Sequence, residues 1–193
     1  MRVAVLVSGS GTILDTFLAD GIPVALVAAD RPCAALGKAE RAGVPAELVR
    51  RESFGPTFDR EAYARLLADR LRAHDVDLVA MAGFGTILGH PMHDAFPGRI
   101  LNTHPALLPA HPGWHAVRDV LASGDTITGC TIHVAGLEVD TGPILAQTTV
   151  DVLADDDEAT LHERIKAVER PLYSQTLRGI LDGMIPLPDT QET

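Results

Sequence analysis

The segment Arg2-Val-Ala-Val-Leu-Val-Ser-Gly-Ser-Gly-Thr-Ile-Leu-Asp-Thr-Phe-Leu-Ala19 joins an apolar run, a glycine-rich break and a helical pattern. Residues 2–7 are apolar almost throughout, which is typical of a parallel strand that is covered on both faces. Residues 8–12 interrupt that strand, and residues 13–19 carry apolar side chains at helical spacing. A buried strand, a tight turn and a helix in this order predict the start of a doubly wound α/β sheet.

The same alternation of strand and helix continues through the first hundred residues. Further strands are predicted at 23–29, 44–49, 76–82 and 99–103, and helices at 34–42 and 60–73. Beyond them we predict a helix at 114–122, antiparallel or edge strands at 127–134 and 143–150, and a long helix at 158–181 with an interruption at Pro171. We expect a single-domain α/β fold over residues 1–185, with a mostly parallel sheet, late antiparallel strands and a long C-terminal helix. Residues 186–193 are predicted to be a flexible tail.

Composition limits the classes of partner. Of the 193 residues, 46% are hydrophobic and 22% charged, and the formal net charge is −10. An acidic chain argues against general binding to nucleic acids or membrane surfaces, both of which need a basic face. We expect small-molecule substrates, a cytoplasmic location and a homodimer as one possible assembly. Cys33 and Cys130 lack metal-type spacing and are expected to be core or near-core thiols rather than a disulfide.

The glycine-rich turn Ser8-Gly-Ser-Gly-Thr12 lies between the first strand and the first helix. Glycines let the backbone approach a ligand, and the N–H groups at a helix start can bind a phosphate. The turn is not a full dinucleotide fingerprint, because Leu14 stands where a third glycine would be, and it lacks the lysine of a P-loop. From these residues alone, a structural turn and an anion site are equally good interpretations.

A second set of polar residues follows a later strand. Asn102 and His104 are two residues apart in a strand, so both side chains point to the same face, and Pro105 stiffens the chain after them. Asp140 precedes Thr-Gly-Pro in a turn-rich segment, where it either caps the turn or places a carboxylate beside the imidazole. An amide, an imidazole and a carboxylate are sufficient for acyl transfer without a covalent enzyme intermediate or a metal.

Other chemistries fit the sequence less well. No three or four metal ligands converge at zinc-type spacing, so no metal site is predicted. The elbow motif of a serine hydrolase is absent as well. His133 alternates on a strand and is expected on its inward face, whereas His111 and His115 are expected at the surface or behind the site. The acidic run 155–158 suits the start of the long helix.

Four stretches, Val5–Thr12, Ala82–Phe84, Asn102–Pro109 and Asp140–Pro143, resemble in order and spacing the formyltransferase superfamily that uses 10-formyltetrahydrofolate. The resemblance covers residue 2 to about residue 181 and implies a Rossmann-like formyltransferase fold. In its single-domain length the chain is most similar to members that formylate the amine of 5'-phosphoribosylglycinamide. The implied reaction gives formylglycinamide ribonucleotide and tetrahydrofolate in de novo purine synthesis, with 10-formyltetrahydrofolate as co-substrate and no metal.

The resemblance also implies a role for each site residue. Asn102 and His104 would contact the formyl oxygen, and Asp140 would keep His104 protonated. The implied phosphoribosylglycinamide contacts are Gly11, Thr12, Ile13 and Glu169. The implied folate contacts are Arg60, Gly85, Thr86, Ile87, Leu88 and Asn102. Without the resemblance, Arg60 and Glu169 would be interpreted as surface charges on their helices.

The chain departs from the family pattern at two places. Ile13 stands where the family has an asparagine, so only the backbone at this position can bind a phosphate. Gly85-Thr86 replaces Met-Arg, which removes an arginine from the folate region. Our hypothesis is that Lys166 supplies part of the missing positive charge. A related acceptor, such as a nucleotide-linked amino sugar, and a non-catalytic nucleotide-binding module remain alternatives. The acidic surface and the missing extra domains disfavour a methionyl-tRNA formyltransferase or a formyltetrahydrofolate hydrolase.

Overall fold

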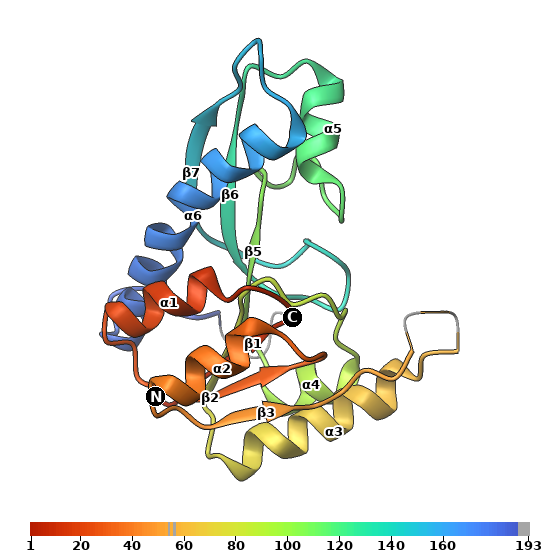
Figure 1. Ribbon diagram of the computed structural model, residues 1–193, viewed down its shortest axis with the longest axis vertical. Helices are drawn as coiled ribbons and strands as arrows, with labels where there is room; N and C mark the ends of the chain where they lie inside the picture. The colour runs from red at the N-terminus through yellow and green to blue at the C-terminus, as the bar shows by residue number, and fades with distance from the viewer. Residues whose placement is uncertain (54, 56, 189–193) are drawn as a thin grey trace. The chain divides into compact units, whose positions relative to one another are not determined.

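The sheet of this computed structural model has the strand order β3-β2-β1-β4-β5-β6-β7 (Figure 1). The structure describes residues 1–53, 55 and 57–188. The strands are β1 (Val3–Val7), β2 (Val24–Ala29), β3 (Ala46–Leu48), β4 (Leu78–Met81), β5 (Ile100–His104), β6 (Ile127–Val134) and β7 (Ile144–Asp151). The helices are α1 (Thr12–Ala19), α2 (Ala34–Arg41), α3 (Arg60–Ala73), α4 (His90–Ala95), α5 (Ala116–Ser123) and α6 (Glu158–Leu181). The predicted fold class is confirmed.

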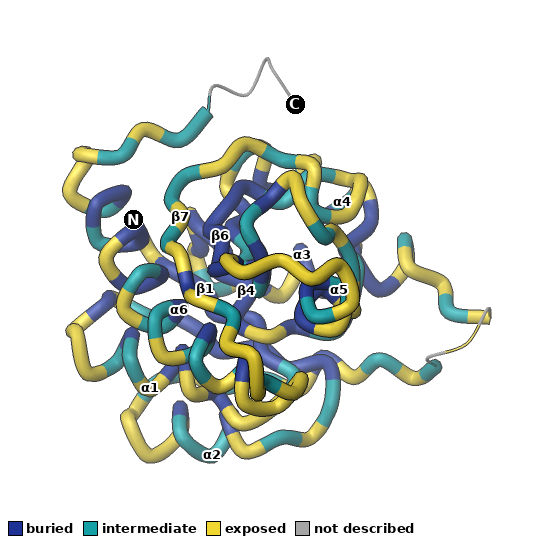
Figure 2. The backbone as a smooth tube through the Cα atoms, turned by 90° about the horizontal axis from the view of Figure 1, so that it is seen from above, coloured by how far each residue is buried: buried dark blue, intermediate teal, exposed yellow. Residues whose placement is uncertain are grey.

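The chain divides into two compact units. The first unit comprises residues 1–101 with 187–188, and the second comprises residues 102–186. In the first unit, β1 pairs in parallel with β2 and with β4, and β2 pairs in parallel with β3. All five residues of β1 are fully buried, as the apolar run predicts (Figure 2). Side chains from α1 and α3, including Phe17, Leu67 and Leu71, are also fully buried and complete this core.

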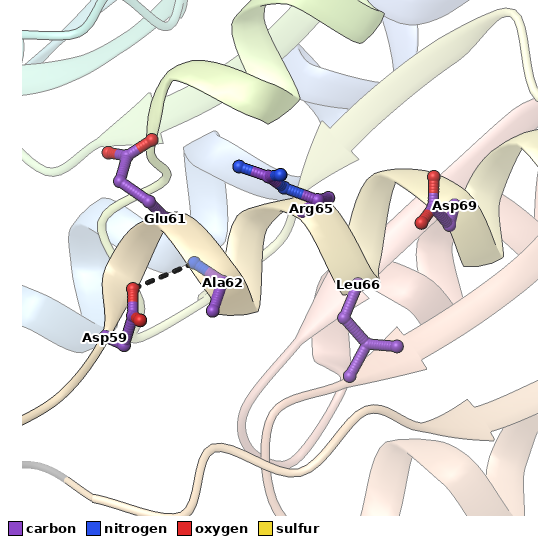
Figure 3. A pocket seen from close by; sticks show the side chains of 6 residues that line it. All are labelled: Asp59, Glu61, Ala62, Arg65, Leu66 and Asp69. Atoms are coloured by element: carbon purple, nitrogen blue, oxygen red, sulfur yellow. Dashed lines mark hydrogen bonds between the residues drawn. The ribbon is translucent and has the colours of Figure 1, made fainter.

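Helix α3 begins where the sequence predicts. The side chain of Asp59 accepts a hydrogen bond from the backbone N–H of Ala62 at 2.9 Å, which satisfies an otherwise unpaired donor (Figure 3). This cap makes Arg60 the first helical residue and leaves its side chain exposed. A shallow hollow runs along the same helix, lined by Asp59, Glu61, Ala62, Arg65, Leu66 and Asp69. None of the predicted site residues lines it.

The second unit is built on an antiparallel pair of strands. β6 and β7 pair over their full lengths, from Ile127 opposite Asp151 to His133 opposite Ile144. The antiparallel pairing confirms the prediction made from the alternating pattern. Residues from α5, β6 and α6 form a common core that includes Val120, Cys130 and Ile165.

Two details of the helices differ from the predictions. Pro171 lies inside α6 without ending it. The helix continues because Ile165, Tyr173 and Leu177 on either side of the proline are all buried, and that burial outweighs one lost backbone hydrogen bond. The sequence analysis missed α4, which has only six residues and is therefore too short to show helical periodicity.

The start of α6 depends on the acidic run. Asp157 caps the helix by accepting from the backbone N–H of Thr160, and the Thr160 hydroxyl accepts from the backbone N–H of Asp157. Asp156 accepts two hydrogen bonds from Arg164, at 2.7 and 2.8 Å, and one from the backbone N–H of Leu153. The run therefore anchors the loop after β7 to the first turns of α6.

Replacing Asp156 with asparagine is expected to reduce the acid sensitivity of folding. The hydrogen bonds from Arg164 and from the Leu153 backbone hold the pKa of Asp156 well below its ordinary value of 3.8. A carboxyl with a lowered folded-state pKa stabilises the protein above its unfolded pKa and loses that effect as the pH falls below it. Melting curves between about pH 6 and pH 3 should show a lower melting temperature and a shallower acid-induced decline for the variant. The control is Asp155→Asn, and equal declines for all three proteins would contradict the assignment.

Three other features concern the C-terminal tail, the two cysteines and the possibility of membrane-spanning helices. The predicted tail begins at residue 186, and its residues 189–193 lie outside the described residues. Cys33 and Cys130 are free thiols. Cys130 is buried as expected, whereas Cys33 is only half-buried. Of the helices that the structure describes, none has the length and apolar character needed to cross a membrane.

Candidate active site

The end of β5 carries two polar side chains on one face. Asn102 and His104 alternate with Thr103, which points to the other face, as strand geometry requires. His104 is only 4% exposed. The amide nitrogen Nδ2 of Asn102 lies 3.1 Å from Nε2 of His133 on the neighbouring segment β6. The structure thus places an amide and two imidazoles in one polar cluster in the second unit.

Asp140 brings a carboxylate to this cluster. Its Oδ2 lies 3.2 Å from Nδ1 of His104, and its Oδ1 lies 3.6 Å from Nε2 of His133. The carboxylate also accepts the backbone N–H of Gly113 at 2.8 Å. Asp140 has a φ of 60°, in the left-handed region, which aspartate tolerates better than most residues. The turn therefore aims the carboxylate inward, with 6% of the side chain exposed.

Both ring nitrogens of His104 face oxygen atoms that only accept hydrogen bonds. Nδ1 faces the Asp140 carboxylate, and Nε2 lies 2.8 Å from the backbone carbonyl of His111. A neutral imidazole carries one N–H and can donate to only one of these oxygens. The cationic ring satisfies both contacts, and the buried carboxylate beside it balances its charge. The ring of His104 is thus held between two acceptors.

The two ring nitrogens of His133, by contrast, face one acceptor and one donor. Its Nδ1 donates to the backbone carbonyl of Val134 at 3.0 Å, so its Nε2 is free to accept from the Asn102 amide. Burial lowers the pKa of His133, since the charged ring would lose its hydration there. A neutral His133 then fixes which end of the Asn102 side chain is the donor. Sequence alternation placed His133 on the inward face of its strand, but only the structure reveals this partner.

Two further histidines lie outside the buried cluster. His111 is half-buried, and its Nε2 lies 2.7 Å from the exposed carboxylate of Asp125. His115 is exposed at the position before α5. His111 thus supports the cluster through its backbone carbonyl, behind His104, while His115 is a surface residue.

Glu169 is not the surface charge that helical periodicity alone would predict. It is 9% exposed, and its Oε1 accepts a hydrogen bond from the Thr103 hydroxyl at 2.7 Å. Burial raises the pKa of Glu169, although the bond from Thr103 acts in the opposite direction. Because Thr103 and His104 point to opposite faces of β5, Glu169 is held on the face away from the imidazole cluster.

The glycine-rich turn lies in the first unit. Gly11 has a φ of 71°, and a Cβ built on it would lie 2.7 Å from the Cβ of Ala35. Positive φ and close packing against α2 both require glycine there. Helix α1 starts at Thr12, whose side chain is exposed, while the Ile13 side chain is 6% exposed and belongs to the core. Any contact of Ile13 with a ligand is therefore a backbone contact.

The segment 85–88 follows β4 and is tied to the ends of two other strands. The Gly85 N–H donates to Ser8 Oγ at 2.7 Å, and the Thr86 hydroxyl donates to Asp30 at 2.9 Å. Asp30 is fully buried. Burial alone would raise the pKa of Asp30, but hydrogen bonds from Arg31, Ser8 and Thr86 bring it below its ordinary value. Leu88 is buried and Ile87 half-buried, so these two side chains anchor the segment.

The comparisons with known proteins agree with this geometry. Residues 1–177 match the family described as formyl transferase. The chain belongs to the formyl transferase family. It is 47% identical over 176 residues to a phosphoribosylglycinamide formyltransferase of Mycobacterium tuberculosis, with 89% of this chain and 80% of that protein covered.

Two other members of the formyl transferase family extend the comparison. A trifunctional purine biosynthetic protein of Drosophila melanogaster is 37% identical over 191 residues, which is 94% of this chain and 14% of that protein. The crystal structure of glycinamide ribonucleotide transformylase 1 from Symbiobacterium toebii is 40% identical, with a TM-score of 0.90 over 98% of this chain and 92% of that chain. The similarity therefore spans both units of the fold.

The hypothesis that Lys166 supplies the missing positive charge stays a prediction. Lys166 donates to Glu163 at 2.8 Å on the surface of α6, so its charge already has a partner. The sequence analysis also missed Asp30 as a residue that organises the segment 85–88. A signal for it exists, since an acidic residue directly follows the predicted strand 23–29, at the end where parallel sheets bind ligands.

Of the described residues, no three His, Cys, Asp or Glu side chains are placed to hold a metal ion. The polar cluster instead offers an amide donor, an imidazole and a buried carboxylate. Groups of this kind can stabilise the negative charge that develops on a carbonyl oxygen when the carbonyl carbon is attacked.

Proposed function

We propose that this chain transfers the formyl group of 10-formyltetrahydrofolate to the amine of 5'-phosphoribosylglycinamide, giving formylglycinamide ribonucleotide and tetrahydrofolate. The observation that carries the proposal is the buried His104–Asp140 pair, with Nδ1 and Oδ2 at 3.2 Å, beside the amide of Asn102. The names and activities of the relatives support the choice of acceptor, and the folate donor follows from the family resemblance.

In the proposed reaction, the amine nitrogen attacks the formyl carbon and a tetrahedral oxyanion forms. Asn102 Nδ2 donates to this oxygen, and the cationic ring of His104 does so through Nε2–H, which would turn from the His111 carbonyl to the oxyanion. Each such donor in a dry site can lower the barrier by about 3–4 kcal/mol. Holding both substrates together supplies a further large part of the acceleration.

Proton transfer completes the exchange. The attacking nitrogen loses a proton, the bond from the formyl carbon to the folate nitrogen breaks, and that nitrogen gains a proton. His104 or an ordered water relays the proton between the two nitrogens. Asp140 stabilises the imidazolium throughout, and His133 holds the Asn102 amide so that an N–H remains directed at the formyl oxygen.

The substrate contacts in this proposal are those that the family resemblance implies. In the first unit, the backbone N–H groups of Gly11, Thr12 and Ile13 would bind the phosphate at the start of α1, where the helix dipole favours a negative charge. In the second unit, Glu169 would contact the ribonucleotide. Arg60 and the segment Gly85–Leu88 would bind the folate. The reaction involves small molecules only, and the free thiols Cys33 and Cys130 suit the cytoplasm that we propose as its location.

Replacing Thr12 with aspartate is expected to weaken binding of 5'-phosphoribosylglycinamide by roughly tenfold to a hundredfold and to leave folate binding unchanged. The new carboxylate would repel the phosphate at the start of α1. The fold should survive, because Thr12 is exposed and a negative charge suits a helix N-terminus. Calorimetric titration of each ligand measures the effect, with Thr12→Asn as the uncharged control of equal shape. Equal losses for both ligands would contradict the phosphate site.

The reaction itself is tested by incubating the purified chain with 10-formyltetrahydrofolate and 5'-phosphoribosylglycinamide while the release of tetrahydrofolate is followed spectroscopically. Release that requires the acceptor is the expected result. Release in water alone would indicate a hydrolase instead. Release only with a nucleotide-linked amino sugar would indicate a different acceptor, and binding of both ligands without release would indicate a non-catalytic module.

A further inference from the structure

The β5–α5 loop (residues 105–115) contributes backbone groups to the polar cluster of the second unit. The loop begins directly after His104 and returns to it, because the carbonyl oxygen of His111 lies 2.8 Å from Nε2 of that histidine. Slightly further along, the backbone N–H of Gly113 donates to Oδ2 of Asp140 at 2.8 Å. The position of the β5–α5 loop therefore decides where the acceptor of the imidazole and a donor to the carboxylate lie.

The first half of the β5–α5 loop is fastened to the sheet by the hydroxyl of Thr131. Thr131 lies on β6 and is fully buried. Its hydroxyl donates to the carbonyl oxygen of Ala106 at 2.7 Å and accepts from the backbone N–H of Leu108 at 3.0 Å. A hydroxyl has a single proton to donate, so any further partner of this oxygen must itself be a donor.

Gln147 supplies that further donor. It lies opposite Thr131 on β7, the last strand of the sheet, and is exposed to solvent. Its Nε2 donates to the Thr131 hydroxyl at 2.9 Å and to the carbonyl oxygen of Leu108 at 2.9 Å. Both backbone polar groups of Leu108 are thereby held, the N–H by Thr131 and the carbonyl by Gln147.

We propose that Gln147 is a positioning residue for formyl transfer, which holds the β5–α5 loop so that the His111 carbonyl keeps its place beside His104. The effect on the rate rests on the proposed function. In that reaction Nε2–H of His104 turns from the His111 carbonyl to the oxyanion, so a displaced carbonyl changes the direction from which the ring starts. Gln147 itself acts on the ring only through the backbone of the loop, because its amide donates to the loop and to β6.

The first test removes both N–H donors and keeps the length of the side chain. Gln147→Met is expected to lower kcat roughly tenfold to a hundredfold, because a small displacement of a catalytic group has a cost of this order. The KM values of both substrates should change less than about twofold, since the side chain does not bind substrate. Turnover is measured well below the melting temperature of each variant, so that a loss of stability alone leaves kcat unchanged.

Two further variants separate the donors from other effects. Gln147→Glu has the shape of glutamine without the N–H donors, and it is expected to show the same loss of kcat even if the methionine variant fails to fold. The matched control is Thr149→Met, which places the same side chain at an exposed position further along β7 and is expected to keep the kcat of the wild type. Wild-type kcat in either folded Gln147 variant, or an equal loss in Thr149→Met, would overturn the proposal.

A double variant shows whether Gln147 acts through the imidazole. In a His104→Ala background, Gln147→Met is expected to lower the residual single-turnover rate no further, because the group that it positions is already gone. A further loss as large as the loss in the wild-type background would mean that Gln147 supports the fold in general, and it would contradict a positioning role.

A spectroscopic measurement needs no turnover, so the two proposals fail separately. The imidazole ¹⁵N resonances of His104 are those missing from the spectrum of His104→Ala. They are expected to shift in Gln147→Met and to stay unchanged in Thr149→Met. Full formyl transfer by the wild type with unchanged His104 resonances in Gln147→Met would refute the inference alone. A wild type that forms no formylated product, while its His104 resonances respond to Gln147→Met, would refute the proposed function and leave the positioning of the ring standing.

Discussion

Replacing His104 with alanine is expected to lower kcat roughly a thousandfold while the fold persists. The alanine variant loses the donor that faces the developing oxyanion and the group that relays the proton. Asp140 keeps the backbone N–H of Gly113 as a partner at 2.8 Å, so its carboxylate is not left without a hydrogen bond. Single-turnover rates with saturating substrates measure the chemical step, and circular dichroism with melting curves measures the fold.

The chain offers a control for this variant. His115 is exposed at the position before α5, and its side chain does not cap the helix. His115→Ala should therefore have the turnover of the wild type. A His104→Ala variant that is folded and retains more than about a tenth of the wild-type kcat would rule out both the oxyanion and the proton-relay role of His104.

Replacing Asp140 with asparagine is expected to lower kcat by roughly a hundredfold or more and to change the melting temperature little. Asparagine tolerates the left-handed backbone that Asp140 adopts at a φ of 60°, and its amide oxygen can still accept from Gly113. Only the negative charge is lost. In the proposed mechanism the carboxylate of Asp140 stabilises the imidazolium of His104, and the uncharged asparagine cannot.

Asp125→Asn is the matched control for this second variant. Asp125 also contacts an imidazole, with its Oδ2 at 2.7 Å from Nε2 of His111, but it is exposed to solvent. Its loss should leave kcat unchanged. Near-normal turnover in Asp140→Asn, or a loss of equal size in Asp125→Asn, would show that the carboxylate of Asp140 has no special part in the reaction.

The elements of the fold were predictable wherever one local pattern decided them. The apolar run of β1, the start of α3 at residue 60 and the alternation of β6 each depend on adjacent residues, and the structure has all three. The prediction failed where packing between residues far apart in the sequence outweighed a local signal. Pro171 indicates a break, yet α6 continues, because side chains on both sides of the proline are buried. Helix α4 is too short to carry a periodic pattern.

The candidate site was also predictable only in part from the sequence. Strand alternation was sufficient to place Asn102 and His104 on one face, because a period of two is a property of the strand itself. The direction of the Asp140 carboxylate depends on a left-handed turn, which the residue types nearby permit but do not require. Its approach to His104 is therefore a result of the tertiary structure.

The sequence by itself determined the order of the strands and helices apart from α4, the glycine-rich turn at residues 8–12 and the pair of polar residues at the end of β5. These follow from propensity, spacing and backbone sterics, which act between neighbours in the chain. The tertiary structure alone decided that Glu169 is buried on Thr103, that His133 orients Asn102 and that Arg51 contacts Thr86. Each of these contacts joins residues more than thirty positions apart or on different elements. Only the packing of the folded chain brings such residues together, since no local pattern encodes their distance.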